Sequence, residues 1–227
     1  MTRKWDEKFS AAGYDESWSI GEVVDAGSSL DEDADPADVS SPSGWGTKCL
    51  KAVTANIGDS ARVGHSVGGA ADWVYWRLEF VVTAESLANG ETMQLFFAEN
   101  SGATINAISL SVDQDAGALR AVFGVDEDGT ETFYTSAIVL DTRYRFECKY
   151  DIANNAWEWR MDGVTKNSGS LSSTHSTDFG TIAIGILAVD NIATGYFDLF
   201  AVDDADWIGA ESSAVTSFDP GMLVGGL

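Results

Sequence analysis

The chain has 227 residues, 44% of them hydrophobic and 22% charged, which is typical of a globular protein that buries a core without disulfide cross-links. Its 36 acidic and 13 basic side chains give a net charge of −23. This balance argues against direct binding to nucleic acid or to an anionic membrane, because phosphate groups are bound by basic patches.

The N-terminal stretch MTRKWDEKFSAAGY has early basic residues but no apolar run after them, so it does not predict a signal peptide. No stretch approaches the ~18 apolar residues that a membrane-spanning helix requires. We therefore expect a protein that is made in a cytoplasm and has no membrane partner.

Residues 25–46, DAGSSLDEDADPADVSSPSGWG, predict a long acidic loop. Asp31, Asp33 and Asp35 begin like an EF-hand, but Pro occupies the positions that need Gly and Glu, which excludes that motif. We predict no metal and no cofactor. A looser calcium site stays an alternative to a solvated loop, formed by these carboxylates or by a later acidic group: Asp203, Asp204 and Asp206.

Alternation of apolar and polar residues predicts strands along most of the chain. The clearest segment is 74–83, VYWRLEFVVT, in which Trp76, Leu78 and Phe80 share one face. The same pattern recurs in the segments 105–113, 118–125, 143–151, 156–161, 180–187 and 195–202. Gln114–Gly117 and Asp128–Gly129 are turn signals. About ten to thirteen strands with short turns indicate a sandwich or a jelly roll.

Segment 92–98, TMQLFFA, breaks the alternation, because Leu95, Phe96 and Phe97 are consecutive. Either the strand is covered on both sides, which is the commoner case, or Phe96 contacts another chain.

The hairpin YDIANNAWEWRMDG, residues 150–163, places Trp157, Trp159 and Met161 on one face and charged residues on the other. This pattern favours a core-facing strand over a platform on which sugars stack. Of the two cysteines, Cys148 faces the core and Cys49 has the opposite parity to its apolar neighbours. We predict that they form no disulfide with each other.

No catalytic constellation is visible in the sequence. A glycanase needs two carboxylates that flank the scissile bond, and no strand carries such a pair. The acidic residues 31–38 have no aromatic frame around them. His65 and His175 lie in Gly- or Ser-rich contexts, without a nucleophile motif. We predict that the protein is not an enzyme.

Several stretches together resemble concanavalin A-like, laminin-G-like β-sandwich domains of the kind found in bacteriophage structural proteins. They are KFSAAGYDESWS, DEDAD, SGWGTKCLKAV, WVYWRLEFVV, the hairpin YRFECKYD…AWEWRMDG and GYFDLFAVDD. The resemblance covers about residues 5–207. It implies an all-β, antiparallel two-sheet jelly-roll sandwich whose last strand lies beside the first. This fold hosts lectins, glycanases and structural modules alike. We expect one domain, 1–208, and a non-strand tail, 209–227.

The first functional hypothesis is a non-enzymatic virion structural protein, a decoration protein on a bacteriophage capsid that is assembled in the host cytoplasm. The phage-domain resemblance, the lack of an active site and the acidic charge favour it. Its partners would be the major capsid protein, other virion proteins or further copies of the chain. The predicted contact residues are Phe96 and the apolar residues of the tail: Phe218, Met222, Leu223, Val224 and Leu227.

The alternative hypothesis is a carbohydrate-binding module that recognises glycans through aromatic side chains in loops. Trp45, in SGWG, and Trp73, next to GGAAD, are the candidates, because Gly-rich loops expose aromatic rings. Either residue can equally anchor its loop, which is the interpretation that we favour.

Overall fold

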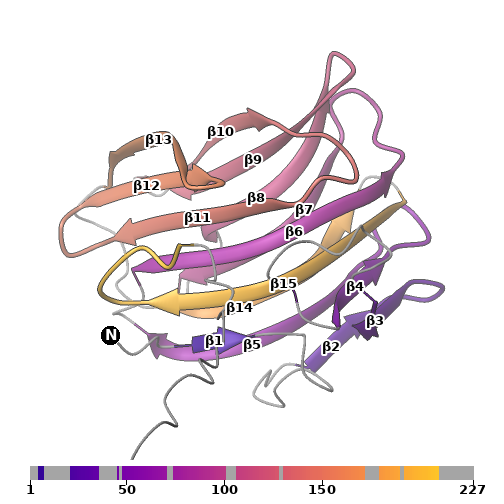
Figure 1. Cartoon of the computed structure of the whole chain (residues 1–227), viewed down its shortest axis with the longest axis horizontal. Coiled ribbons are helices and arrows are strands. Elements are labelled where there is room, and N and C mark those ends of the chain that lie inside the picture. Colours follow the sequence, from indigo (N-terminus) through magenta and orange to yellow (C-terminus); the bar gives the residue numbers. More distant parts are fainter. Residues whose placement is uncertain are drawn as a thin grey trace, which may run out of the picture.

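The computed structural model describes residues 5–7, 21–35, 45, 48–70, 74–100, 106–127, 130–171, 179–189 and 192–209. It shows two antiparallel β-sheets that pack face to face as two layers (Figure 1). The eight-stranded sheet has the order β13-β12-β11-β6-β15-β4-β3, and β1 pairs with β15 at one end. The seven-stranded sheet has the order β10-β9-β8-β7-β14-β5-β2. The predicted all-β sandwich is confirmed.

The eight-stranded sheet comprises β1 (Trp5–Glu7), β3 (Ser29–Ala34), β4 (Cys49–Val53), β6 (Tyr75–Glu85), β11 (Tyr144–Asp151), β12 (Ala156–Met161), β13 (Val164–Ser170) and β15 (Ala193–Asp203). The seven-stranded sheet comprises β2 (Gly21–Val24), β5 (Ala61–Ala70), β7 (Thr92–Asn100), β8 (Asn106–Asp115), β9 (Ala118–Asp126), β10 (Glu131–Ala137) and β14 (Phe179–Val189). Within the described ranges, no helix is long and apolar enough to cross a membrane.

The space between the sheets is filled with aromatic side chains. Trp157, Trp159 and Met161 of β12 are at most 3% exposed, so the predicted core-facing strand is confirmed. Two tight turns fix the register of the flanking hairpins. Ala116–Gly117 joins β8 to β9, and Asp162–Gly163 joins β12 to β13; all four residues have positive φ, as a two-residue hairpin turn of type I′ requires.

The three consecutive apolar residues of strand β7, Leu95, Phe96 and Phe97, are all buried. Phe96 is 1% exposed and lies between Trp76 and Phe146, with ring centroids 6.0 and 6.2 Å away. The predicted contact of Phe96 with another chain is therefore wrong for this fold. A register shift against β8 between Gln94 and Phe96 breaks the alternation, so Leu95 and Phe96 both join the core.

The prediction of a loop over residues 25–46 is wrong in part, because Ser29–Ala34 forms β3, an edge strand that pairs with β4. Its acidic residues do not prevent pairing, since tertiary context overrides a low strand propensity. The cysteines form no disulfide, as predicted. Cys49 has the opposite parity to Leu50, yet it is fully buried, because the outer face of the eight-stranded sheet is covered at that point.

Candidate functional site

A groove of about 510 Å³ lies on the seven-stranded sheet, over β7, β8, β9 and β10. Its lining is mostly hydroxyl, amide and charged side chains: Thr92, Gln94, Ser109, Ser111, Asp113, Arg120, Val122, Glu131, Phe133 and Thr135. These strands lie side by side in the seven-stranded layer (Figure 1). The groove is therefore built on a hydrogen-bonded sheet and not on loops.

The alternation within each strand explains why this face is polar. In β8, Ile108, Leu110 and Val112 are fully buried in the core, so Ser109 and Ser111 point to the opposite face. In β10, Tyr134 packs against the core, which turns its neighbour Phe133 outward. One residue of shift in β8 would replace the two serines of the lining with apolar side chains.

The strand registers arrange the lining residues in rows that cross the sheet. Residues that face each other on neighbouring strands bring their side chains together on one face. The three rows, read from β10 towards β7, are Phe133–Gly124–Ser109, Thr135–Val122–Ser111–Gln94 and Arg120–Asp113–Thr92. A ligand laid along a row would therefore contact several strands at once.

Phe133 supplies an aromatic ring at the β10 side of the groove. The residue is 59% exposed, although the other phenylalanines for which a burial class is described on this sheet are at most 8% exposed. The exposed Phe133 ring therefore lacks most of the stabilisation that an aromatic side chain gains by burial in a core. A solvent-facing ring beside hydroxyl groups can stack on the apolar face of a ligand while the hydroxyls bind its polar edge.

Gly124 keeps the floor of the groove open. The Ser109 hydroxyl donates a hydrogen bond to the Glu131 carboxylate, Oγ to Oε1, at 2.6 Å, and this contact passes over the β9 backbone at Gly124. A Cβ at this position would overlap both the Ser109 hydroxyl and the Glu131 carboxylate. The missing side chain thus allows the two polar groups to meet across a strand.

Gly124→Ala is expected to destabilise the fold by about 1–3 kcal/mol, because the added methyl group overpacks the floor and separates Ser109 from Glu131. Urea denaturation measures the change. Ser109→Ala is the matched control, since it removes the hydrogen bond without filling the floor and should cost only about 1 kcal/mol. An equal effect of the two changes would show that the floor is not tightly packed.

Arg120 is the cation among the lining residues, and two carboxylates engage it. It donates to Asp113 through Nε at 2.9 Å and through Nη2 at 2.6 Å, which is a bidentate pair. A third bond runs from Nη1 to Asp115. The hydrogen bonds that Arg120 donates to Asp113 raise the pKa of the guanidinium above its usual value. Asp113 is thereby committed to Arg120.

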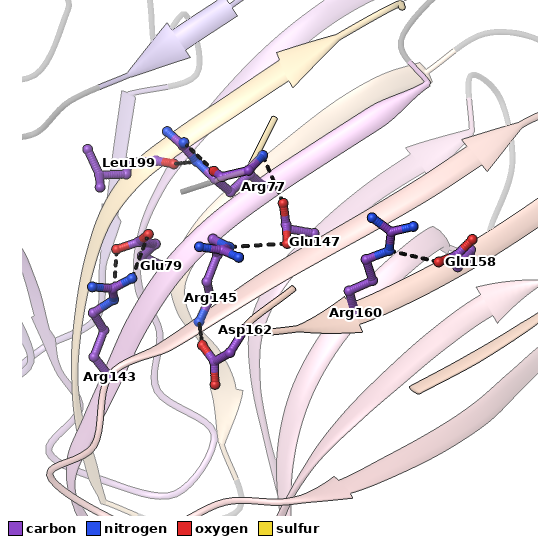
Figure 2. Close-up of polar contacts among 10 residues, drawn as sticks. Arg77, Glu79, Arg143, Arg145, Glu147, Glu158, Arg160, Asp162 and Leu199 are labelled. Carbon is purple, nitrogen blue, oxygen red and sulfur yellow. Dashed lines mark hydrogen bonds and ion pairs between the residues drawn. The ribbon is translucent and has the colours of Figure 1, made fainter. Parts of the chain in front are cut away.

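The outer face of the eight-stranded sheet also carries charged residues, but the chain covers them. Figure 2 shows Arg143 bonded to Glu79 and Arg145 bonded to Glu147, with closest distances of 3.0 and 3.1 Å. The main chain of Gly209 donates to Glu147 and accepts from Arg77, both at 3.0 Å. The centre of this face, around Arg77, Glu79 and Glu147, is therefore a buried polar layer and not an open site.

Trp45 belongs to that covered layer. It is 8% exposed, its Nε1 donates to Glu79 at 2.8 Å, and it packs in a cluster with Val81, Tyr196 and Leu199. The alternative role of Trp45 in sugar stacking is wrong for this fold, because its ring is buried against the eight-stranded sheet. The other predicted contact residues lie outside the described residues: Trp73, Phe218, Met222, Leu223, Val224 and Leu227.

In the part of the chain that the structure describes, no three His, Cys, Asp or Glu side chains are placed to hold a metal ion. The groove's own carboxylates have different surroundings: Asp113 pairs with Arg120, and Glu131 accepts from Ser109. The chemistry that this lining offers is therefore hydrogen bonding and ring stacking.

The sequence patterns do not predict this groove. Phe133 lies outside the segments that the alternation predicts as strands, and Ser109 and Ser111 lie on the solvent side of the predicted strand 105–113. The parity of 105–113 did indicate which side chains face outward. The pairing of four strands, which brings these side chains together, has no signal in the sequence.

No family model and no curated protein matches the sequence. Solved structures match in fold. The binding domain of botulinum neurotoxin DC in complex with SialylT has 9% identity and a TM-score of 0.58, over 90% of this chain and 48% of that chain. The botulinum neurotoxin type G receptor-binding domain has 7% identity and a TM-score of 0.57, over 91% and 49%.

An alginate lyase from Pseudomonas aeruginosa has 11% identity and a TM-score of 0.54, over 69% of this chain and 82% of that chain. At such identities the likeness shows the fold alone, a lectin-like jelly-roll sandwich. The chain spans about half the length of the neurotoxin structures. These structures lend no support to the bacteriophage context that the sequence resemblance implied.

Proposed function

We propose that the protein is a glycan-binding module whose site is the groove on the seven-stranded sheet. The observation that carries the proposal is the exposed Phe133 ring within a lining of hydroxyl and amide groups. A sugar ring has an apolar face and a hydroxyl-rich edge. Phe133 would stack on the face, while Ser111 and Gln94, which are partly exposed, would bind the hydroxyls.

The fold likeness supports this proposal by analogy. Solved structures of the same architecture are described as a neurotoxin binding domain in complex with SialylT, an alginate lyase and a sialidase. Because folds host many functions, the groove and not the architecture has to support the claim. The proposal therefore rests first on the residues that line the groove.

The proposed activity is binding without cleavage. A glycosidase needs one carboxyl group that donates a proton and a second carboxylate that attacks or activates water. Here Asp113 is held in a bidentate pair with Arg120, and Glu131 is held by Ser109. Both carboxylates are thus engaged in structural contacts, which supports a binder over a hydrolase.

A place on a virion surface stays a prediction from the sequence. Phe96 is buried in the core, and the predicted docking residues of the tail lie outside the described residues. A glycan-binding role does not depend on that location, since such a module can belong to a particle or to a cell.

Phe133→Ala is expected to weaken glycan binding by tenfold or more, about 1.4 kcal/mol, because the stacking surface is removed. The test is a glycan array with the wild-type protein, followed by titration of each bound glycan. Val164→Ala on β13 is the matched control, since this side chain is equally exposed, at 59%, on the other sheet. An array without any bound glycan, or equal affinity of wild type and Phe133→Ala, would refute the proposal.

A further inference from the structure

The charges around the groove restrict its ligand. A site for acidic sugars usually presents a cation that can pair with the ligand's carboxylate or sulfate. Here the lining guanidinium of Arg120 already makes three hydrogen bonds to carboxylates, two to Asp113 and one to Asp115. A ligand carboxylate would have to displace an aspartate that is already well placed.

The acidic side chains around the groove outnumber its basic ones, so the groove repels anions. Asp113, Asp115 and Glu131 carry three negative charges against the one positive charge of Arg120, which leaves a local net charge of −2. The whole chain adds to this field with its net charge of −23. Like charges placed close together in a partly desolvated groove repel each other, so an acidic sugar would bind less well than its uncharged counterpart.

The extent of the lining indicates the length of the ligand. Phe133 lies on β10 and Gln94 on β7, so the groove crosses four strands. Three spacings of about 4.8 Å separate the outer strands of this set, which gives about 14 Å. This span exceeds a single sugar ring, and hydroxyl groups on β8 lie between the two ends.

We propose that the groove takes an uncharged oligosaccharide, laid across β10, β9, β8 and β7, and discriminates against acidic sugars. This inference rests on the proposed glycan-binding function and adds the charge and the length of its ligand. Phe133 stacks on one sugar unit, and Gln94 and Thr92 bind a unit at the far side. The carboxylates around Arg120 provide the discrimination.

The test uses matched pairs of oligosaccharides that differ in charge: manno-oligosaccharides against oligomannuronates, and galacto-oligosaccharides against oligogalacturonates. Each is titrated into the full chain at about 20 mM and about 300 mM salt, because salt screens exposed charges. We expect a neutral member to bind at least tenfold more tightly than its acidic counterpart at low salt. The difference should shrink at high salt. Asp115→Asn should raise the affinity for the acidic member at low salt.

Chain length gives a second readout. Affinity for the neutral series should rise from the disaccharide until the ligand spans the groove and should then level off. Gln94→Ala should weaken binding of the longer members and spare the disaccharide that occupies the Phe133 side. A disaccharide that binds as tightly as the longer members would overturn the arrangement across four strands.

The outcomes separate the two proposals. Acidic members that bind as tightly as neutral ones, and lose binding in Phe133→Ala, would overturn the charge discrimination and leave the glycan-binding function intact. Neither series binding, together with an array without any bound glycan, would overturn the proposed function and this inference with it.

Discussion

Trp159→Ala is expected to lower the free energy of unfolding by about 3–5 kcal/mol, the range for loss of a large buried aromatic side chain. Trp159 is fully buried and stacks on Phe123, with ring centroids 5.5 Å apart and planes at 17°. Its ring also lies 6.5 Å from Phe146, centroid to centroid. Its removal leaves a cavity between the sheets that the rigid strands on either side fill only in part.

Urea denaturation, followed by circular dichroism, measures this loss. Phe133→Ala is the matched control, since it also removes an aromatic side chain but from an exposed position, and should change stability by no more than about 0.5 kcal/mol. The two substitutions should therefore separate stability from binding. A loss below about 1 kcal/mol for Trp159→Ala would contradict the assignment of β12 to the core.

Glu79→Ala is expected to cost about 1–3 kcal/mol of stability, because it leaves the buried Trp45 Nε1 and the partly buried Arg143 without their acceptor. Glu79 is 1% exposed, accepts from Trp45 at 2.8 Å and pairs with Arg143 at 3.0 Å. Burial raises the pKa of Glu79, and Arg143 and Trp45 oppose that shift. Removal of the carboxylate would also release the Trp45 ring that covers this face of the sheet.

Thermal or urea unfolding of Glu79→Ala measures the effect. Glu158→Ala is the control, because the Glu158–Arg160 pair is partly solvated and such pairs contribute about 0–1 kcal/mol. If both variants were equally stable, the layer shown in Figure 2 would be a set of surface ion pairs and not a buried network.

Sequence alone determined which strands exist in the middle of the chain and which side chains face the core. A strand has a side-chain period of two, so the run Trp157, Trp159, Met161 identifies its buried face without knowledge of the fold. The same reasoning oriented 105–113 correctly. It was less successful for 92–98, since a register shift that breaks the alternation depends on the partner strand.

Only the tertiary structure decided whether the outer face of each sheet is covered or exposed to solvent. Trp45 and Phe133 are both aromatic residues outside the segments predicted as strands. Trp45 is nevertheless buried against the eight-stranded sheet and bonded to Glu79, whereas Phe133 is exposed to solvent. Cys49 is buried on a face that its parity assigned to solvent. The contacts that decide whether these side chains are buried join residues far apart in the chain. Local sequence patterns therefore do not indicate them.

The groove also combines features that the sequence determines with features that only the tertiary structure determines. The polar character of its residues follows from strand parity, whereas their assembly follows from the order β10-β9-β8-β7 and from the registers that align Phe133, Gly124 and Ser109 in one row. Periodicity fixes the face of a side chain because it is a property of one strand. The neighbours of that side chain depend on hydrogen bonds between strands, which are set when the sheets assemble.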